Sequence, residues 1–152
     1  MRCLALSLSL WLAASVVALA GESVRILKVL PHFLDQKGRH ALNPSLYERD
    51  AYQAKLRQDA KLRSGMRFDV QWKGGDDKPL KLRVELRGGK GDEITRRTLE
   101  GPAARHGWFS NWSEIKITGD DYQKFGELVA WRVTLWDGDQ QVAEEKSFLW
   151  QN

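Results

Sequence analysis

The sequence predicts a mainly β protein, an antiparallel β-sandwich of about seven strands with one inserted surface helix. Two observations predict this class. Apolar and polar residues alternate with a period of two through most of the chain after residue 65, and turns rich in glycine and aspartate separate the alternating runs. A closed barrel is the structural alternative.

The first two predicted elements are a strand and the helix. The strand covers residues 24–34, where Pro31 indicates an edge position or a bend because proline cannot donate to a strand ladder. The helix covers about residues 46–63. Ser45 has the character of an N-cap, and Glu48 three residues later completes a capping box. The apolar stripe of this helix is thin, so we expect it to lie on the surface.

The alternating runs predict six further strands, at 66–72, 80–87, 93–99, 111–118, 127–136 and 142–150. Trp72 and Trp131 share the inward phase of their strands, so both are predicted core residues. Tyr122 lies in the corner before the strand at 127–136. With these three residues the chain resembles an immunoglobulin-like or fibronectin-III-like sandwich, from which it departs by lacking a cysteine pair and by containing the helix.

Residues 1–20 have the layout of a cleaved secretory signal peptide: a basic start, an uncharged apolar run and small residues leading to Ala20. We therefore expect one mature domain, 21–152, located in the periplasm or secreted. A retained membrane anchor is the alternative, because the apolar run approaches the length of a spanning helix. The single cysteine, Cys3, lies in the leader, so the mature domain is expected to be free of disulfides.

Composition and motifs indicate neither catalysis nor nucleic-acid binding. The formal net charge is +4 and the charges are interspersed. No Gly-x-Ser-x-Gly elbow is present. The histidines, His32, His40 and His106, show no metal-ligand spacing, and the aspartate pairs occupy turns. We expect no catalytic residue, metal or cofactor, and no membrane span after signal cleavage. A small hydrolase, the distant alternative, requires a polar cleft around one histidine.

Aromatic residues cluster just before and within the strand at 111–118. Trp108, Phe109, Asn111 and Trp112 are candidate ligand-binding residues, because exposed rings stack on sugars and a neighbouring amide fixes the hydroxyls. Trp112 has the opposite phase to the inward residues of its strand and is expected to face outward. The alternative is that Trp108 and Phe109 plug one end of the sandwich while Trp112 packs under the helix.

The start of the helix offers a second candidate surface. Tyr47, Arg49 and Tyr52 are candidate partner-binding residues, since tyrosine and arginine often anchor interfaces. Alternatively, this segment pins the helix to the sheet. Taken together, the sequence favours an exported, non-enzymatic binding or structural module, with a carbohydrate-binding module as the alternative. The expected partner is a protein or an envelope glycan, and the sequence gives no oligomeric state.

Overall fold

Seven strands and two α-helices follow one another in the part of the chain that the computed structural model describes, residues 23–75, 79–104, 107 and 109–151. They are β1 (Arg25–Asp35), α1 (Leu46–Gln58), β2 (Arg63–Lys73), β3 (Leu80–Lys90), β4 (Glu93–Ala103), β5 (Asn111–Thr118), α2 (Gly119–Phe125), β6 (Glu127–Asp137) and β7 (Gln140–Lys146). All paired strands are antiparallel. The mainly β class is therefore confirmed.

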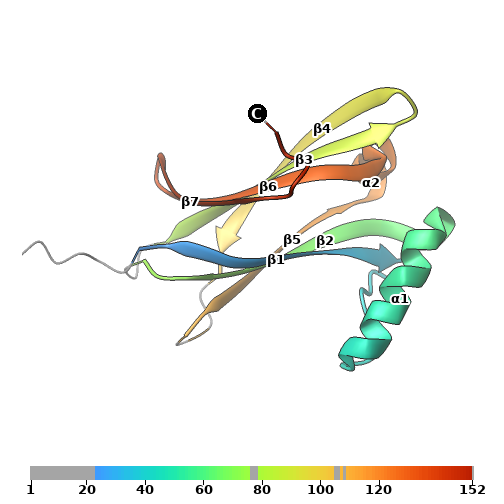
Figure 1. Cartoon of the computed structure of the whole chain (residues 1–152), viewed down its shortest axis with the longest axis horizontal. Coiled ribbons are helices and arrows are strands. Elements are labelled where there is room, and N and C mark those ends of the chain that lie inside the picture. The colour runs from blue at the N-terminus through green and yellow to red at the C-terminus, as the bar shows by residue number, and fades with distance from the viewer. Residues whose placement is uncertain (1–22, 76–78, 105–106, 108, 152) are drawn as a thin grey trace, which may run out of the picture.

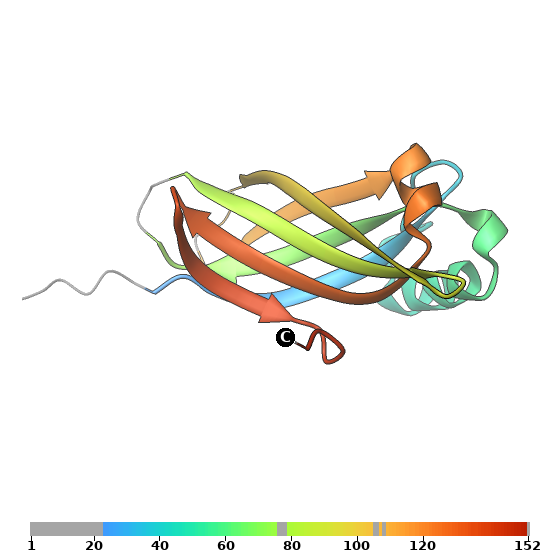
Figure 2. The same ribbon diagram turned by 90° about the horizontal axis from the view of Figure 1, so that it is seen from above.

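The strands form two facing sheets (Figure 1). The three-stranded sheet has the order β1-β2-β5, and the four-stranded sheet has the order β4-β3-β6-β7. Seen from above, both helices lie at the same end of the two layers (Figure 2). The finer resemblance to immunoglobulin-like or fibronectin-like sandwiches stays a prediction. Among the described residues, no helix has the length and apolar character that a membrane crossing requires.

The core lies between the sheets and follows from the alternation in the sequence. The inward positions of β2 are Met66, Phe68, Val70 and Trp72, and all four are buried. Burial of Trp72 is complete, and its indole Nε1 donates to the Ser113 hydroxyl at 3.0 Å, so the one polar atom of the ring is satisfied. Trp131 is partly buried and packs against the same core, as its phase predicts.

Several elements differ from the expected ones. Strand β2 begins at Arg63 rather than at 66, β3 ends at Lys90 rather than at 87, and β4 ends at Ala103 rather than at 99. Helix α1 ends at Gln58 rather than near residue 63, because the Asp59 carboxylate accepts the Lys61 amide and starts a separate 3-10 turn. The corner after Thr118 forms a second helix, α2. The last strand ends at Lys146 rather than at Trp150. The predicted N-cap is present, since the Ser45 hydroxyl accepts the Glu48 amide at 3.5 Å.

The segment after β7 folds over the outer face of the four-stranded sheet. Ser147 still pairs with Trp131 through both its amide and its hydroxyl, and the chain then turns. Two guanidinium groups then lie over the ring of Trp150. The Cζ atom of Arg87 is 4.1 Å from the ring centroid, and the Cζ atom of Arg132 is 5.2 Å from it. These cation–π contacts give Trp150 a place outside the inter-sheet core, where strand alternation does not apply.

A buried arginine joins α1 to both sheets. The Arg63 guanidinium donates to the carbonyls of Leu56 and Arg57 at 2.6 and 2.8 Å, and so satisfies two acceptors at the C-terminus of α1. It also donates to the Glu127 carboxylate of β6 at 2.7–2.8 Å and lies 4.4 Å from the centroid of Phe33 in β1. This one side chain therefore contacts α1, β1 of the three-stranded sheet and β6 of the four-stranded sheet.

A buried glutamine closes one position of the β1 edge. Gln53 of α1 accepts the Phe33 amide at 2.8 Å and donates to the Phe33 carbonyl at 2.9 Å. The same amide group donates to the His40 carbonyl at 2.8 Å. Gln53 thus occupies the place of a neighbouring strand at Phe33, which protects an exposed edge from pairing with another chain.

We expect Gln53→Met to destabilise the fold by about 1–3 kcal/mol, because it keeps the buried volume but leaves backbone groups at the edge unpaired. Urea unfolding checks this. Gln58→Met, at the exposed end of the same helix, should change stability by less than about 0.5 kcal/mol. Equal losses for both variants would contradict the edge-closing role of Gln53.

Candidate functional site

The outer face of the three-stranded sheet carries an ordered array of polar side chains. Strand register places three residues in each row across β1, β2 and β5. The rows are Lys28–Gln71–Trp112, Leu30–Asp69–Glu114 and His32–Arg67–Lys116. We call these nine residues the polar face. They point away from the core because side chains alternate along a strand and the intervening β2 residues are the buried ones.

Helix α1 lies beside the polar face at one end. It packs against β1, and each element contributes a leucine, Leu34 and Leu56, that is buried outside the inter-sheet core. The helix and the turn before it therefore form the border of the polar face at the row that contains His32. The opposite end of the polar face, at Trp112, is open.

An ion-pair network occupies the centre of the polar face. Arg67 donates to the Asp69 carboxylate through Nε at 2.7 Å, and its Nη1 lies 2.8 Å from a Glu114 oxygen. Lys116 pairs with the other Glu114 oxygen at 2.8 Å. The hydrogen bond from Lys116 and the charge of Arg67 hold the pKa of Glu114 below its ordinary value, although burial opposes this. Glu114 is therefore an ionised hydrogen-bond acceptor at neutral pH.

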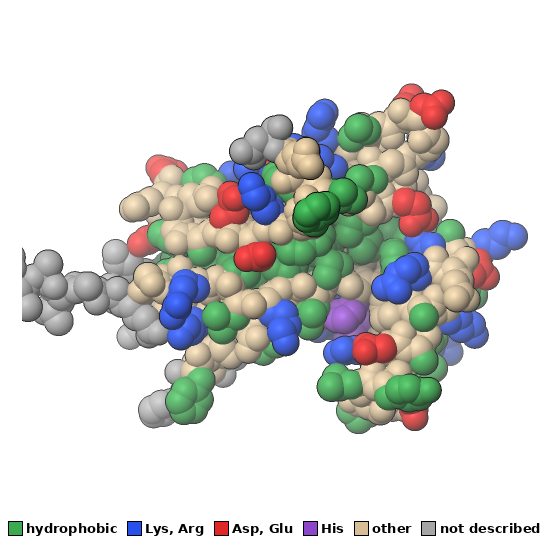
Figure 3. Space-filling view, in the orientation of Figure 1, with side chains coloured by type: hydrophobic (Ala, Val, Ile, Leu, Met, Phe, Trp, Pro, Cys, Tyr) green, Lys and Arg blue, Asp and Glu red, His purple; other side chains and the backbone are tan. Residues whose placement is uncertain are grey.

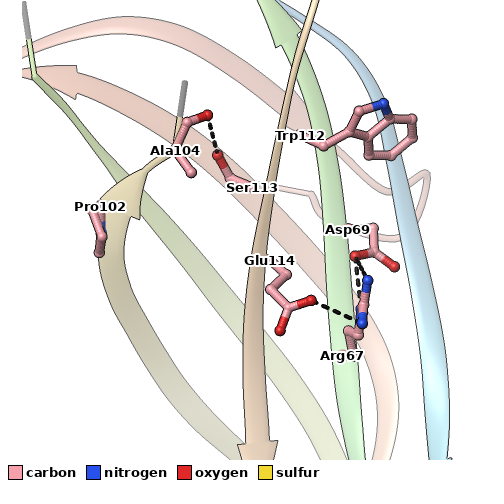
Figure 4. Close-up of a pocket in the computed structure, with 7 residues that line it drawn as sticks. All are labelled: Arg67, Asp69, Pro102, Ala104, Trp112, Ser113 and Glu114. Carbon is pink, nitrogen blue, oxygen red and sulfur yellow. Dashed lines mark hydrogen bonds and ion pairs between the residues drawn. The ribbon is translucent and has the colours of Figure 1, made fainter. Parts of the chain in front are cut away.

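An indole ring flanks this network. Trp112 is 43 % exposed, and the neighbouring Gln71 amide donates to the Ser110 hydroxyl at 3.0 Å. Figure 4 shows the Trp112 ring near Asp69, while Ser113 turns toward the Ala104 carbonyl. A surface hollow of about 390 Å³ is lined by Arg67, Asp69, Pro102, Ala104, Trp112, Ser113 and Glu114. An aromatic plane, two carboxylates and a guanidinium group thus share one hollow.

Two histidines lie together at the end of the polar face near α1. The ring centroids of His32 and His40 are 5.2 Å apart, and His32 Nε2 is 3.7 Å from Asp69 Oδ2. Burial lowers the pKa of both imidazoles, and the charges of Arg49 and Arg67 lower it further while Asp69 opposes them. Both rings are therefore mainly neutral at pH 7.

The spacing of the histidines along the sequence did not predict that His32 and His40 lie together. The chain reverses between them in a turn organised by Asp35, whose carboxylate accepts the amides of Lys37 and Arg39 at 2.8 and 2.9 Å. This turn returns His40 to the side of His32. His106 lies outside the described residues.

The four aromatic-loop candidates differ in their placement. Trp108 lies outside the described residues. Phe109 is 94 % exposed, so it does not plug the end of the sandwich. Asn111 is buried, and its side-chain oxygen accepts the Gly107 amide at 3.4 Å, which removes it from the exposed surface. Trp112 faces outward, as its phase predicts.

The three helix candidates do not form one cluster. Tyr47 is 84 % exposed, and Arg49 pairs with the adjacent Asp50 at 3.0 Å. The Tyr52 hydroxyl donates to Asp35 at 2.8 Å and so ties the helix to the turn after β1. The site residues that sequence reasoning missed are Arg67, Asp69 and Glu114. All three occupy outward positions of β2 and β5. Charged residues that only face solvent occupy such positions as well, so the sequence pattern did not distinguish these three.

Within the described residues, no group of three or more histidine, cysteine, aspartate or glutamate side chains is arranged to hold a metal ion. Comparisons with protein-family models, with curated proteins and with solved structures find no match to this chain. The polar face is therefore interpreted from its own geometry.

We expect stability to fall as the pH drops below about 6.5. The folded-state pKa values of His32 and His40 lie below the ordinary value of 6.5. The unfolded chain therefore takes up protons first, and the stabilisation that is complete above this pH is lost below it. Urea midpoints measured from pH 8 to pH 5 check this. The double variant His32→Asn/His40→Asn should show a shallower pH dependence, and an unchanged slope would contradict the assignment.

Proposed function

We propose that this chain is an exported, non-enzymatic binding module that holds a glycan on its polar face. The observation that carries the proposal is the half-exposed Trp112 ring beside the charged network of Arg67, Asp69 and Glu114, in one hollow of about 390 Å³. An aromatic plane with a few convergent polar groups is the arrangement by which proteins hold small polar ligands that have one apolar face.

Each group has a defined part in this proposal. The indole ring of Trp112 stacks on the apolar face of a pyranose. The carboxylates of Asp69 and Glu114 accept hydrogen bonds from sugar hydroxyls, and Arg67 donates to ring or hydroxyl oxygens. The two carboxylates and the two cations Arg67 and Lys116 balance in formal charge, which favours a neutral or weakly charged glycan over nucleic acid.

The ionised state of Glu114 supports binding rather than glycoside cleavage. A general acid for that reaction needs a raised pKa, so that it carries a proton at neutral pH. The pKa of Glu114 is instead lowered, first by the hydrogen bond from Lys116. Asp69 accepts from Arg67 at 2.7 Å. Glu114 is therefore a carboxylate that accepts hydrogen bonds and does not donate a proton at neutral pH.

Export is part of the proposal, and its support is the signal-like sequence of residues 1–20. A periplasmic or secreted location would place the polar face among envelope or extracellular glycans. The proposal also keeps the immunoglobulin-like or fibronectin-like class, supported by two facing antiparallel sheets of three and four strands.

We expect the chain to be retarded in affinity electrophoresis by at least one of a panel of soluble polysaccharides, and Trp112→Ala to weaken that binding by about tenfold or more. Phe148→Ala is the matched control, because Phe148 is 91 % exposed and lies outside the polar face. Retardation by no polysaccharide, or equal binding by the Trp112→Ala and native chains, would refute the proposal.

A further inference from the structure

Two surface hollows adjoin each other along α1, apart from the polar face. The first, of about 200 Å³, lies between the turn after β1 and the helix, and Lys37, Arg39 and Lys55 contribute to its lining. The second, of about 350 Å³, is lined by Leu42, Glu48 and Ala51. Tyr52 and Lys55 line both hollows. The hollows therefore meet at these two side chains, which are neighbours on one face of the helix.

The first hollow has an excess of positive charge. Its only acidic lining residue is Asp35, whose carboxylate already accepts two backbone amides, the Tyr52 hydroxyl and the Arg39 guanidinium. Within the described residues, neither Lys37 nor Lys55 has an ion pair. The hollow is thus lined by three cations and by one carboxylate whose hydrogen bonds are all made within the turn and to Tyr52. This excess of positive charge favours an anionic ligand group.

Asp35 is in a state that keeps this excess. Burial on its own would raise the pKa of Asp35, but the hydrogen bonds from Arg39, Tyr52 and Lys37 outweigh it and hold the pKa well below the ordinary value. The carboxylate therefore stays ionised and bonded inside the turn. It fixes the positions of Lys37 and Arg39 through their backbone amides.

The second hollow is mainly apolar. Leu42 is 58 % exposed, and Ala51, the Tyr52 ring and the aliphatic stem of Lys55 complete its wall. Figure 3 shows hydrophobic side chains gathered over the N-terminal end of α1, where Leu46 and Tyr47 are also exposed. Glu48 gives this hollow one hydrogen-bond acceptor.

We propose that the paired hollows bind the carboxyl terminus of a protein chain whose last side chain is apolar. The terminal carboxylate lies among Lys37, Arg39 and Lys55, and the last side chain enters the hollow formed by Leu42 and Ala51. In a C-terminal residue these two groups branch from one carbon atom, which suits two hollows that share a wall. Both hollows are open on the surface, so a long acyl chain of a fatty acid would stay in water, whereas a single side chain fits.

The test uses short, fluorescently labelled peptides that differ only in their last residue, which is valine, leucine, isoleucine or phenylalanine. Each is made with a free carboxyl terminus and with a terminal amide. Fluorescence anisotropy with the whole mature chain should detect binding of at least one free-carboxylate peptide, and its amide should bind about tenfold more weakly. No binding by any of the peptides, or equal binding of acid and amide, would overturn the proposal.

Two variants locate the site. Lys55→Met keeps the aliphatic stem but removes the charge, and should weaken binding several-fold. Lys61→Met changes an exposed lysine of the 3-10 turn that lines neither hollow, and should have no effect. Equal affinities for these two variants would overturn the assignment. Trp112→Ala should leave peptide binding unchanged, so this inference and the proposed glycan function succeed or fail separately.

Discussion

The contacts of Arg63 are the constraint on which the position of α1, and the arrangement of the end of the sandwich beside it, depends. Burial on its own would lower the pKa of this guanidinium, but the hydrogen bonds and charge of Glu127 outweigh it and raise the pKa. The group therefore stays charged while it satisfies the last carbonyls of α1 and stacks on Phe33. With α1 held in this place, Gln53 reaches the edge of β1 and Tyr52 reaches Asp35.

The two outer faces of the sandwich differ in how much of their surface is already used. On the four-stranded sheet, Trp150 is buried beside Arg87 and Arg132. Trp136, on the same face, has the Arg83 guanidinium 4.6 Å from its ring centroid, and Arg83 also pairs with Glu100 at 2.6 Å. On the three-stranded sheet Arg67 and Lys116 are paired with carboxylates too, but the ring of Trp112 stays partly open above a hollow. This difference is why we assign ligand binding to the three-stranded sheet.

Alternation predicted most of the fold because each half-buried strand repeats one inward and one outward position. The predicted strand at 111–118 has the bounds of β5, and Trp72 is in the core. Alternation fails where the ladder is irregular. A register shift opposite Arg87 and Gly88 leaves Val129 exposed, although it shares the phase of Trp131.

The candidate site was less predictable, because it depends on contacts between distant segments. The outward direction of Trp112 follows from phase, but the assembly of Arg67 with Glu114 depends on the pairing of β2 with β5. The meeting of His32 and His40 depends on the Asp35 turn, whose hydrogen bonds no periodicity reveals. Asn111 appeared to be an exposed ligand in the sequence and is buried, because it lies at the first position of β5 with the inward phase.

Hydrogen exchange of the Arg63→Met variant tests the central claim most directly, with Arg57→Met as a control on the exposed side of the same helix. If Arg63 holds α1 in place, the amides of α1 should lose protection by about tenfold or more relative to those of β3. The control should match the native chain. Unchanged protection of α1, or an equal loss in α1 and β3, would contradict the account.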